Sequence, residues 1–418
     1  MRTGMDAEIV TRQILDVVKS HCTPNIVTNV MNDLRRSEAL ETGMTKGKAN
    51  GHARGKRGLP LDERDKLDRL ITLCQSHLPV DEVCRILLGI GDVFKAHGDT
   101  HRAEEMYTMA LARGEQSGKK GYVAEAYMRR GEIYSRRALW KQSTSDLGCS
   151  RALFTELKHH EALGRVENIL GTNNAEQGRI KKAAELFEHA FVLFERTHQT
   201  QMAGVALMNL GITCNIIGEY DSAVAHYKRA QSCFEEAGDL NHLAELHHNT
   251  GMTYLSKGVY KEAIRQFTMS HALSSSLQNI SLMGLASLGK AHAYYYLHDL
   301  PVALKLVTQA MELFTRSSDQ LSLADAYKVK GMIHRDMRSF GTSASYLHTS
   351  LRINTELNNR LNMAESQFEI GVLETRRNNR GEALQAFQRA RASFKKVGAQ
   401  REVKRIKDQM NSLEGQKR

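Results

Sequence analysis

Small side chains recur along this chain at intervals of 40 residues, and this period limits the possible folds more than any other feature of the sequence. A first column holds seven glycines and one alanine: Gly91, Gly131, Gly171, Gly211, Gly251, Ala291, Gly331 and Gly371. Twelve residues after each member stands a second small residue: Ala103, Ser143, Ala183, Ala223, Ala263, Ala303, Ser343 and Ala383. Seven residues later comes a third: Ala110, Ser150, Ala190, Ala230, Ser270, Ala310, Ser350 and Ala390. Periods of this length are typical of solenoids, in which each repeat packs on the next.

A large side chain stands between the second and third columns in each copy: Tyr107, Leu147, Phe187, Tyr227, Phe267, Val307, Leu347 and Phe387. We interpret each copy as a helical hairpin, in which small residues let two backbones approach and the large residue fills the gap beside them. Only 4 of the 418 residues are proline. Because proline interrupts helices, this scarcity also favours long helices over a β-rich chain.

These columns, with further glycines at the expected turns (Gly98, Gly178, Gly218 and Gly258), resemble the tetratricopeptide repeat. The usual unit of that family has about 34 residues, so we expect the added residues to form an extra helical turn and a longer connection. The resemblance covers about residues 80–398 and is to the longer repeats of G-protein signalling modulators and many bacterial regulators. It implies an all-α, right-handed superhelical solenoid of about eight hairpins with capping helices.

The remaining sequence flanks this array, and we predict five segments from it. An N-terminal pair of amphipathic helices occupies 1–42, a basic glycine-rich linker 43–59, an N-capping helix 60–79, the eight-repeat array 80–398, and a basic C-capping helix with its tail 399–418. Solenoids need such caps because their terminal repeats would otherwise expose apolar surface.

The net charge of +11 belongs to the two ends of the chain. Residues 1–60 hold 10 Lys or Arg against 6 Asp or Glu, residues 388–418 hold 10 against 3, and the rest is balanced at 38 of each. The basic ends could hold nucleic acid or an anionic membrane, although no aromatic interleaving or nucleic-acid motif accompanies them. Within the array, a basic run in the second repeat offers possible contacts to an acidic partner at Arg129, Arg136 and Arg137.

The sequence carries no local signature of catalysis or of a bound metal. It lacks H-E-x-x-H and G-x-S-x-G motifs, and the segment Gly51–Arg57 fails the phosphate-loop pattern. The histidine doublets 159–160 and 247–248 point about 100° apart on a helix and do not converge on one ion. The six cysteines have no paired spacing. We therefore predict a non-enzymatic protein without a cofactor or metal, and, from the lack of a signal peptide or long apolar run, a cytoplasmic one.

The resemblance implies that the first helix of each hairpin lines a concave groove. Carried onto this sequence, its groove positions give an apolar centre in the fourth to sixth repeats: Met208, Asn209, Ile212, Asn215, Ile216, His248, Asn249, Met252, Leu255, Leu285, Leu288, His292, Tyr295 and Tyr296. The outer repeats carry charged residues there, among them Asp325, Lys328 and Arg335 of the seventh. The same side chains could instead pack between neighbouring helices, and the sequence leaves that alternative open.

We therefore predict a scaffold or adaptor that binds a peptide or helix of a protein partner in this groove. The alternative is a regulatory protein that contacts nucleic acid or an anionic membrane through its basic termini, with the array sensing a peptide. The chain lacks the Lys/Asn/Lys/Arg set with which some relatives clamp a C-terminal carboxylate, and it lacks the short C-terminal motifs that regulate G-proteins. Neither chaperone-tail binding nor G-protein regulation is expected.

Overall fold

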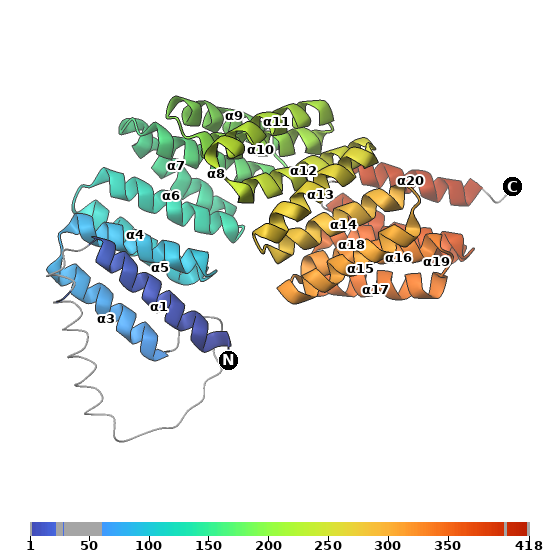
Figure 1. The fold of residues 1–418 in the computed structure, drawn as a ribbon, viewed down its shortest axis with the longest axis horizontal. Coiled ribbons are helices and arrows are strands. Elements are labelled where there is room, and N and C mark those ends of the chain that lie inside the picture. Colours follow the sequence, from blue (N-terminus) through green and yellow to red (C-terminus); the bar gives the residue numbers. More distant parts are fainter. Residues whose placement is uncertain (1, 22–27, 29–60, 397–398, 416–418) are drawn as a thin grey trace, which may run out of the picture. The chain divides into compact units, whose positions relative to one another are not determined.

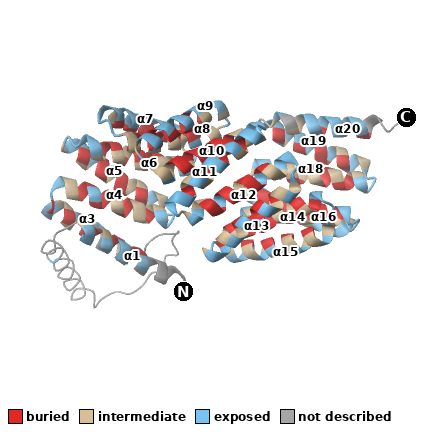
Figure 2. Ribbon diagram, turned by 45° about the horizontal axis from the view of Figure 1, so that its top comes forward, coloured by how far each residue is buried: buried red, intermediate tan, exposed pale blue. Residues whose placement is uncertain are grey.

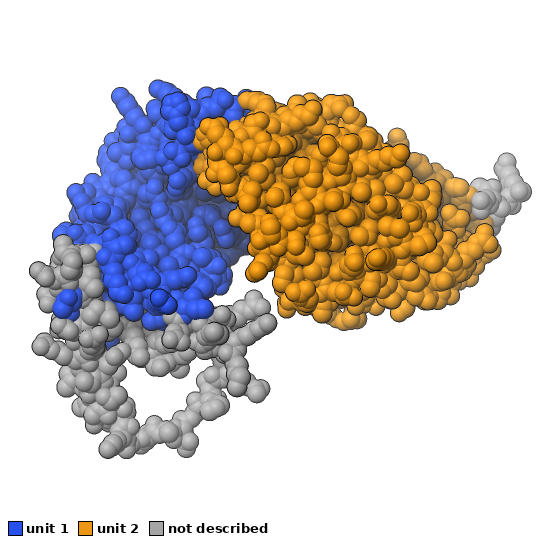
Figure 3. All heavy atoms as spheres, viewed as in Figure 1, with its two compact units in different colours: residues 1–199 blue, residues 200–418 orange. Residues whose placement is uncertain are grey.

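The computed structural model describes residues 2–21, 28, 61–396 and 399–415. These residues form nineteen α-helices and no strand, so the all-α prediction is confirmed for the described part of the chain (Figure 1). The chain divides into two compact units, residues 1–199 and 200–418 (Figure 3). Each unit is a stack of antiparallel helical hairpins.

Unit 1 begins with α1 (Arg2–His21) and α3 (Leu61–His77). Three hairpins follow: α4 (Val80–Ala96) with α5 (Thr100–Gln116), α6 (Lys120–Arg136) with α7 (Trp140–Glu156), and α8 (His160–Glu176) with α9 (Ile180–Arg196). Helix α1 buries Val10, Ile14 and Val18 in a core shared with α3 and α4. The predicted second N-terminal helix and the linker 43–59 lie outside the described residues.

Unit 2 holds five hairpins and a closing helix. These are α10 (Thr200–Ile217) with α11 (Tyr220–Ala237), α12 (Leu240–Lys257) with α13 (Tyr260–Ser276), α14 (Ile280–Tyr296) with α15 (Leu300–Ser317), α16 (Gln320–Asp336) with α17 (Phe340–Glu356), and α18 (Arg360–Arg376) with α19 (Arg380–Lys396). Helix α20 (Gln400–Gly415) closes the unit by burying Ile406, Met410 and Leu413 in a core shared with α19. We call the first helix of each hairpin helix A and the second helix B.

The repeat of 40 residues consists of two helices of about equal length and two short turns. Helices α6 and α7 have 17 residues each, and three residues, 137–139, join them. The turn into the next hairpin, 157–159, has the same length. The expected longer connection is therefore wrong, because the residues added to the usual unit lengthen the helices instead.

A left-handed residue ends most of these helices. Gly98 has φ 78° and Ala138 has φ 56°, and the equivalent position adopts positive φ at 20-residue intervals from 98 to 378. In the α6–α7 turn, the Leu139 N–H donates to the Tyr134 carbonyl at 2.9 Å. This bond reaches back five residues, as in the Schellman motif, which caps the free carbonyls of a helix end.

The large residue of each repeat packs directly on the glycine column. A Cβ built on Gly171 would lie 2.5 Å from the Phe187 ring, and one built on Gly251 would lie 2.7 Å from Phe267. The alanine of this column, Ala291, belongs to the repeat whose large residue is Val307, and both are fully buried in one core cluster. The interpretation of small residues accommodating a large one is thus confirmed, and the exception has a smaller partner.

Helices A and B occupy different sides of unit 2. Each helix A contacts the helix A of the next hairpin, from α10 to α18, whereas helices B of neighbouring hairpins make no comparable contact among the described residues. A stack whose helices are closer on one side curves toward that side. We call the side formed by α10, α12, α14, α16 and α18 the inner face of unit 2. Buried residues lie where the helices meet (Figure 2).

Candidate partner-binding site

The residues predicted for the groove lie on three helices A of unit 2, namely α10, α12 and α14. Three of them are exposed: Ile216 (56%), Met252 (37%) and Tyr296 (45%). The following are half-buried: Asn209, Ile212, Asn215, His248, Asn249, Leu255, Leu285 and His292. The inner face of unit 2 therefore presents three exposed apolar side chains that are separated by half-buried residues, several of which are polar.

Met208, Leu288 and Tyr295 differ from this description because they are buried. Leu288 and Tyr295 belong to the core shared by α14, α15 and α16. Neighbouring helices cover these three residues, so their direct contact with a partner stays a prediction that the geometry does not favour. They pack between helices, the alternative that the sequence left open.

Tyr295 holds a hydrogen-bond network between helices A. Its hydroxyl donates to Asp336 Oδ2 at 2.7 Å and accepts from Arg335 Nη2 at 2.9 Å. Arg335 also pairs with Glu369 Oε2 at 2.5 Å. Burial, and then the hydrogen bond to Asp336, raises the pKa of Tyr295. The network joins α14, α16 and α18 and keeps the phenol protonated.

A second polar group, which we call the Lys328 cluster, comprises His292, Asp325, Lys328 and Glu365. Lys328 Nζ lies 2.5 Å from Asp325 Oδ1 and also pairs with Glu365. Burial disfavours the ammonium, but the two carboxylates outweigh it and raise the pKa of Lys328. Burial lowers the pKa of His292, so its imidazole is neutral at pH 7. The cluster then carries two negative charges and one positive charge.

The Lys328 cluster is surrounded by protein and still reaches solvent. Burial is the largest influence on the pKa of both His292 and Asp325, yet 33% of the Asp325 side chain and 39% of the Glu365 side chain remain accessible. Side chains that have protein atoms on most sides and still contact solvent lie at the bottom of a concave surface. We infer that the inner face of unit 2 is recessed here.

Two polar atoms near this surface lack hydrogen-bond partners among the described residues. They are Asn215 Oδ1 on α10 and His248 Nδ1 on α12. Burial lowers the pKa of His248 to about 4, so the ring is neutral, and it packs on Phe267 with centroids 5.5 Å apart. A buried polar group without a partner costs free energy, and each such group calls for a specific explanation such as a water or a ligand.

The side of unit 1 formed by its helices A, α4, α6 and α8, which we call its inner side, has a different character, because its charged side chains pair with one another. Lys95 pairs with Glu132 at 3.0 Å, and Arg136 pairs with the same carboxylate at 2.9 Å. Arg129 pairs with Asp92 and, at 3.0 Å, with Glu125. No comparable exposed apolar set occurs there among the described residues.

The basic run of the second repeat is also largely neutralised within the chain. Arg129 and Arg136 have the partners just described, and Arg137 pairs with Glu104. Lys119 and Arg130 pair with Asp81 and Asp146. An acidic partner would have to displace these carboxylates, so contacts at Arg129, Arg136 and Arg137 stay a prediction that the geometry does not favour.

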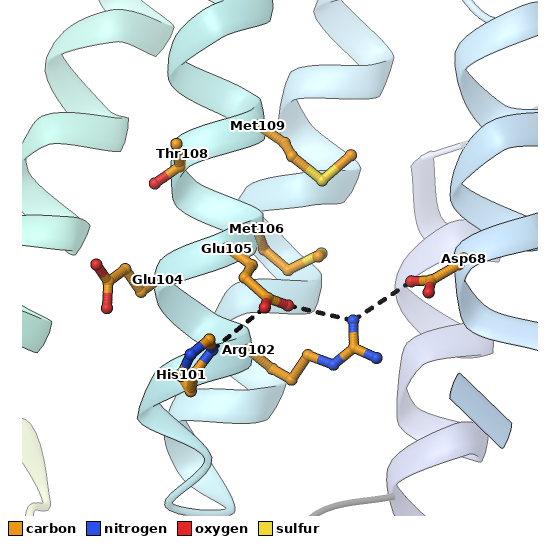
Figure 4. Close-up of a pocket in the computed structure, with 8 residues that line it drawn as sticks. All are labelled: Asp68, His101, Arg102, Glu104, Glu105, Met106, Thr108 and Met109. Carbon is orange, nitrogen blue, oxygen red and sulfur yellow. Dashed lines mark hydrogen bonds and ion pairs between the residues drawn. The ribbon is translucent and has the colours of Figure 1, made fainter. Parts of the chain in front are cut away.

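Two open pockets among the described residues lie elsewhere. One, of about 430 Å³, is lined mainly by α5 and by Asp68 of α3 (Figure 4). Its Arg102 already bonds Asp68 at 3.3 Å and Glu105 at 3.2 Å. Another, of about 500 Å³, lies on α15 beside Lys330. Both are lined largely by helices B, so we keep the inner face of unit 2 as the candidate site.

No group of three or more His, Cys, Asp or Glu side chains that could hold a metal ion occurs among the described residues. One described helix, α10, is long and apolar enough to span a membrane by length and composition. It packs along α11, where Gly204 and Gly211 meet Phe234 and Tyr227. A core helix passes the same test.

The basic C-terminal segment is described as far as Gly415. Arg405 of α20 lies over the Phe368 ring, 4.5 Å from its centroid, and so faces α18. A role of this segment in binding nucleic acid or a membrane stays a prediction.

Comparison with known proteins agrees with the repeat architecture. Residues 202–276, which cover nearly all of the two hairpins α10–α13, match the family model described as tetratricopeptide repeat. The transcriptional activator NprA of Geobacillus stearothermophilus is 24% identical over 176 residues, which are 42% of this chain and 43% of that protein. The match thus spans less than half the length of this curated relative.

Similar solved structures share the fold at low sequence identity. Aspartyl phosphate phosphatase F from Bacillus subtilis aligns with a TM-score of 0.56 and 13% identity, over 82% of this chain and 94% of that one. A Rap protein complexed with competence and sporulation factor aligns with a TM-score of 0.53 and 14% identity, over 84% and 99%. The matched pair of hairpins carries tetratricopeptide repeats, and its glycine, small-residue and aromatic contacts recur in the neighbouring hairpins; the chain as a whole is similar in fold to these solved structures.

Proposed function

We propose that this protein is a non-catalytic regulatory scaffold that captures a peptide segment of a partner on the inner face of unit 2. The observation that carries the proposal is the exposure of Ile216, Met252 and Tyr296 on neighbouring helices A of one face. Exposed apolar side chains spaced along adjoining helices offer anchor points for the side chains of a bound peptide. The pairing of charges along the inner side of unit 1 directs the proposal to unit 2.

The polar groups of the same face fit a peptide rather than a purely apolar ligand. An extended peptide presents an N–H and a carbonyl at every residue, and these need partners when water is excluded. Asn215 Oδ1 and His248 Nδ1 are unpaired, and Asn209 and Asn249 occupy equivalent places on α10 and α12. Such groups could bond a peptide backbone while Ile216, Met252 and Tyr296 contact its side chains.

The relatives support a regulatory role. The similar Rap structure is described as complexed with competence and sporulation factor, and the curated relative is described as a transcriptional activator. A structure of the same fold that holds such a factor supports the capture of a partner by this chain as well.

A matched pair of methionines in one hairpin tests the proposal. Met252 on α12 is 37% exposed on the inner face, and Met269 on α13 is 38% exposed on a helix B. Peptides are selected from a display library of random short sequences against the full chain, and their affinities are then measured by fluorescence anisotropy. We expect Met252→Glu to weaken binding at least about tenfold, because a charge would be desolvated against apolar groups, and Met269→Glu to leave it unchanged. Equal effects of the two substitutions, or no selectable peptide, would refute the proposal.

A further inference from the structure

An aromatic platform adjoins the Lys328 cluster on the inner face of unit 2. We use the term aromatic platform for Tyr260 and Tyr296, whose rings stack with centroids 5.4 Å apart and planes 13° apart. Tyr295 meets Tyr296 edge-on at 5.3 Å and 67°. Because the network through Arg335 and Asp336 fixes Tyr295, the platform is held in place while 45% of Tyr296 stays exposed.

Charged groups of both signs lie near this platform. Glu369, Arg405 and Lys328 act electrostatically on the Tyr296 hydroxyl, so the platform adjoins the Lys328 cluster. In the Lys328 cluster, Asp325 and Glu365 share one ammonium while His292 is neutral. One negative charge is therefore left over in a recess from which part of the solvent is excluded.

Other cations lie toward the α18–α20 end of the face. Arg376 acts on Asp336, and Arg405 lies over Phe368 and acts on Tyr296. The charged groups that act on Asp325 and on His292 belong to the Lys328 cluster itself. The excess of negative charge is thus located at Asp325 and Glu365.

Building on the proposed function, we propose that the inner face of unit 2 selects peptides that carry a positive charge, which the carboxylates of Asp325 and Glu365 bind beside the aromatic platform. An aromatic face attracts a cation through its quadrupole, and the attraction grows when water is partly excluded. Carboxylates beside the ring add charge-assisted hydrogen bonds. A partner with a carboxylate at that position is repelled, and repulsion of wrong partners is an effective source of specificity.

The test uses matched libraries of short synthetic peptides and the full-length protein. Their other positions carry an equal mixture of Leu, Ile, Met and Phe, and they differ at one position, which is Arg, Lys, Gln or Glu; both ends are blocked. A fifth library has Gln at that position and a free N-terminus, which separates a terminal ammonium from a basic side chain as the source of the charge. We expect the Arg and Lys libraries to bind at least about tenfold more tightly than the Glu library.

Two glutamates give the variant and its control. Glu365→Gln removes the excess charge and keeps the Asp325–Lys328 pair that holds the cluster together, so we expect the preference for cationic peptides to fall several-fold. Glu312→Gln changes an exposed carboxylate on α15 and should preserve the preference. Circular dichroism and thermal unfolding confirm that both variants fold.

A pH series adds a readout that folding alone does not move. Protonation of His292 supplies the missing positive charge, so binding of the Lys library should weaken as the pH falls toward and below the lowered pKa of His292, and His292→Gln should remove that dependence. Equal binding of the Lys and Glu libraries, or a preference unaffected by Glu365→Gln, would overturn this inference and leave the proposed function standing. Failure of every library to bind would overturn both.

Discussion

The pairing of glycine with an aromatic ring inside each hairpin predicts a strong energetic coupling between two positions. A Cβ on Gly171 would lie 2.5, 2.7 and 3.0 Å from three carbons of the Phe187 ring. Normal contact between carbons is about 3.5–4.0 Å. Phe187 is buried, so its ring can move only by displacing its neighbours. The natural exception in the sixth hairpin, Ala291 with Val307, shows the combination that avoids this overlap.

The magnitudes follow from these contacts. Overpacking of this severity costs about 3 kcal/mol, and alanine in place of a helical glycine returns about 1 kcal/mol, so Gly171→Ala should destabilise by about 2 kcal/mol. Phe187→Val alone leaves a cavity and should cost about 3 kcal/mol. In the double variant the overlap disappears, and we expect a total loss of about 2 kcal/mol instead of about 5 kcal/mol, which is a coupling of about 3 kcal/mol.

Urea unfolding of the full chain, followed by far-ultraviolet circular dichroism, measures these free energies. Because stability in a repeat array is spread between neighbours, hydrogen exchange of amides in α8 and α9 should locate the loss in this hairpin. Ala291→Gly is the control, since the large residue of its hairpin is Val307; it should cost about 1 kcal/mol of helix propensity and about 1 kcal/mol for the lost packing of one buried methyl group. Additivity of the two substitutions to within about 0.5 kcal/mol would refute the packing argument.

Three further predictions concern the turns, the buried network and acid stability. Gln278→Gly should raise the free energy of unfolding by about 1 kcal/mol, because Gln278 adopts φ 55°, which costs a residue with a Cβ that much; a lower urea midpoint would contradict this. Tyr295→Phe should lower it by about 1.5–3 kcal/mol, since it removes buried hydrogen bonds to the charged Arg335 and Asp336; an unchanged midpoint would show that water replaces the hydroxyl. The pKa of His248 falls to about 4 in the folded protein, below its unfolded value of about 6.5. The unfolded chain therefore binds more protons between these values, and stability should decline by up to about 3 kcal/mol as the pH falls from 6.5 to 4. His248→Phe should reduce that slope, and an identical slope would refute the assignment.

The regular features of the fold could be predicted from the sequence because they arise from small, local choices. The glycine and large-residue columns specify a hairpin, and the structure pairs Gly251 with Phe267 as those columns require. The length of the turns could not be predicted in the same way. At positions such as Ala138 and Gln278 the left-handed turn residue is not glycine, so no residue type marks where the helix ends.

The candidate site could be predicted only as far as the helices that carry it. The groove positions lie on α10, α12 and α14, yet whether a side chain is exposed depends on how closely the next helix approaches. Met208 and Leu288 are buried, whereas Met252 is exposed. The sequence did contain a signal for the Lys328–Glu365 pair. Opposite charges stand at groove positions of consecutive repeats, about one period apart, and this spacing predicts an ion pair between neighbouring helices A.

The helices of the hairpins are nearly equal in length, with 17 or 18 residues each, and they recur every 20 residues. Because the backbone is almost the same every 20 residues, it does not itself distinguish helix A from helix B, and only side chains decide which helices turn toward a partner. Loss of one helix and its turn would leave a chain able to keep stacking, but every helix beyond that point would exchange the inner position for the outer one. Gain or loss of a complete 40-residue unit leaves every later helix on the side that it occupied before. Such a protein can therefore lengthen or shorten its recognition surface in whole hairpins, and it would lose that surface by any change of half a hairpin.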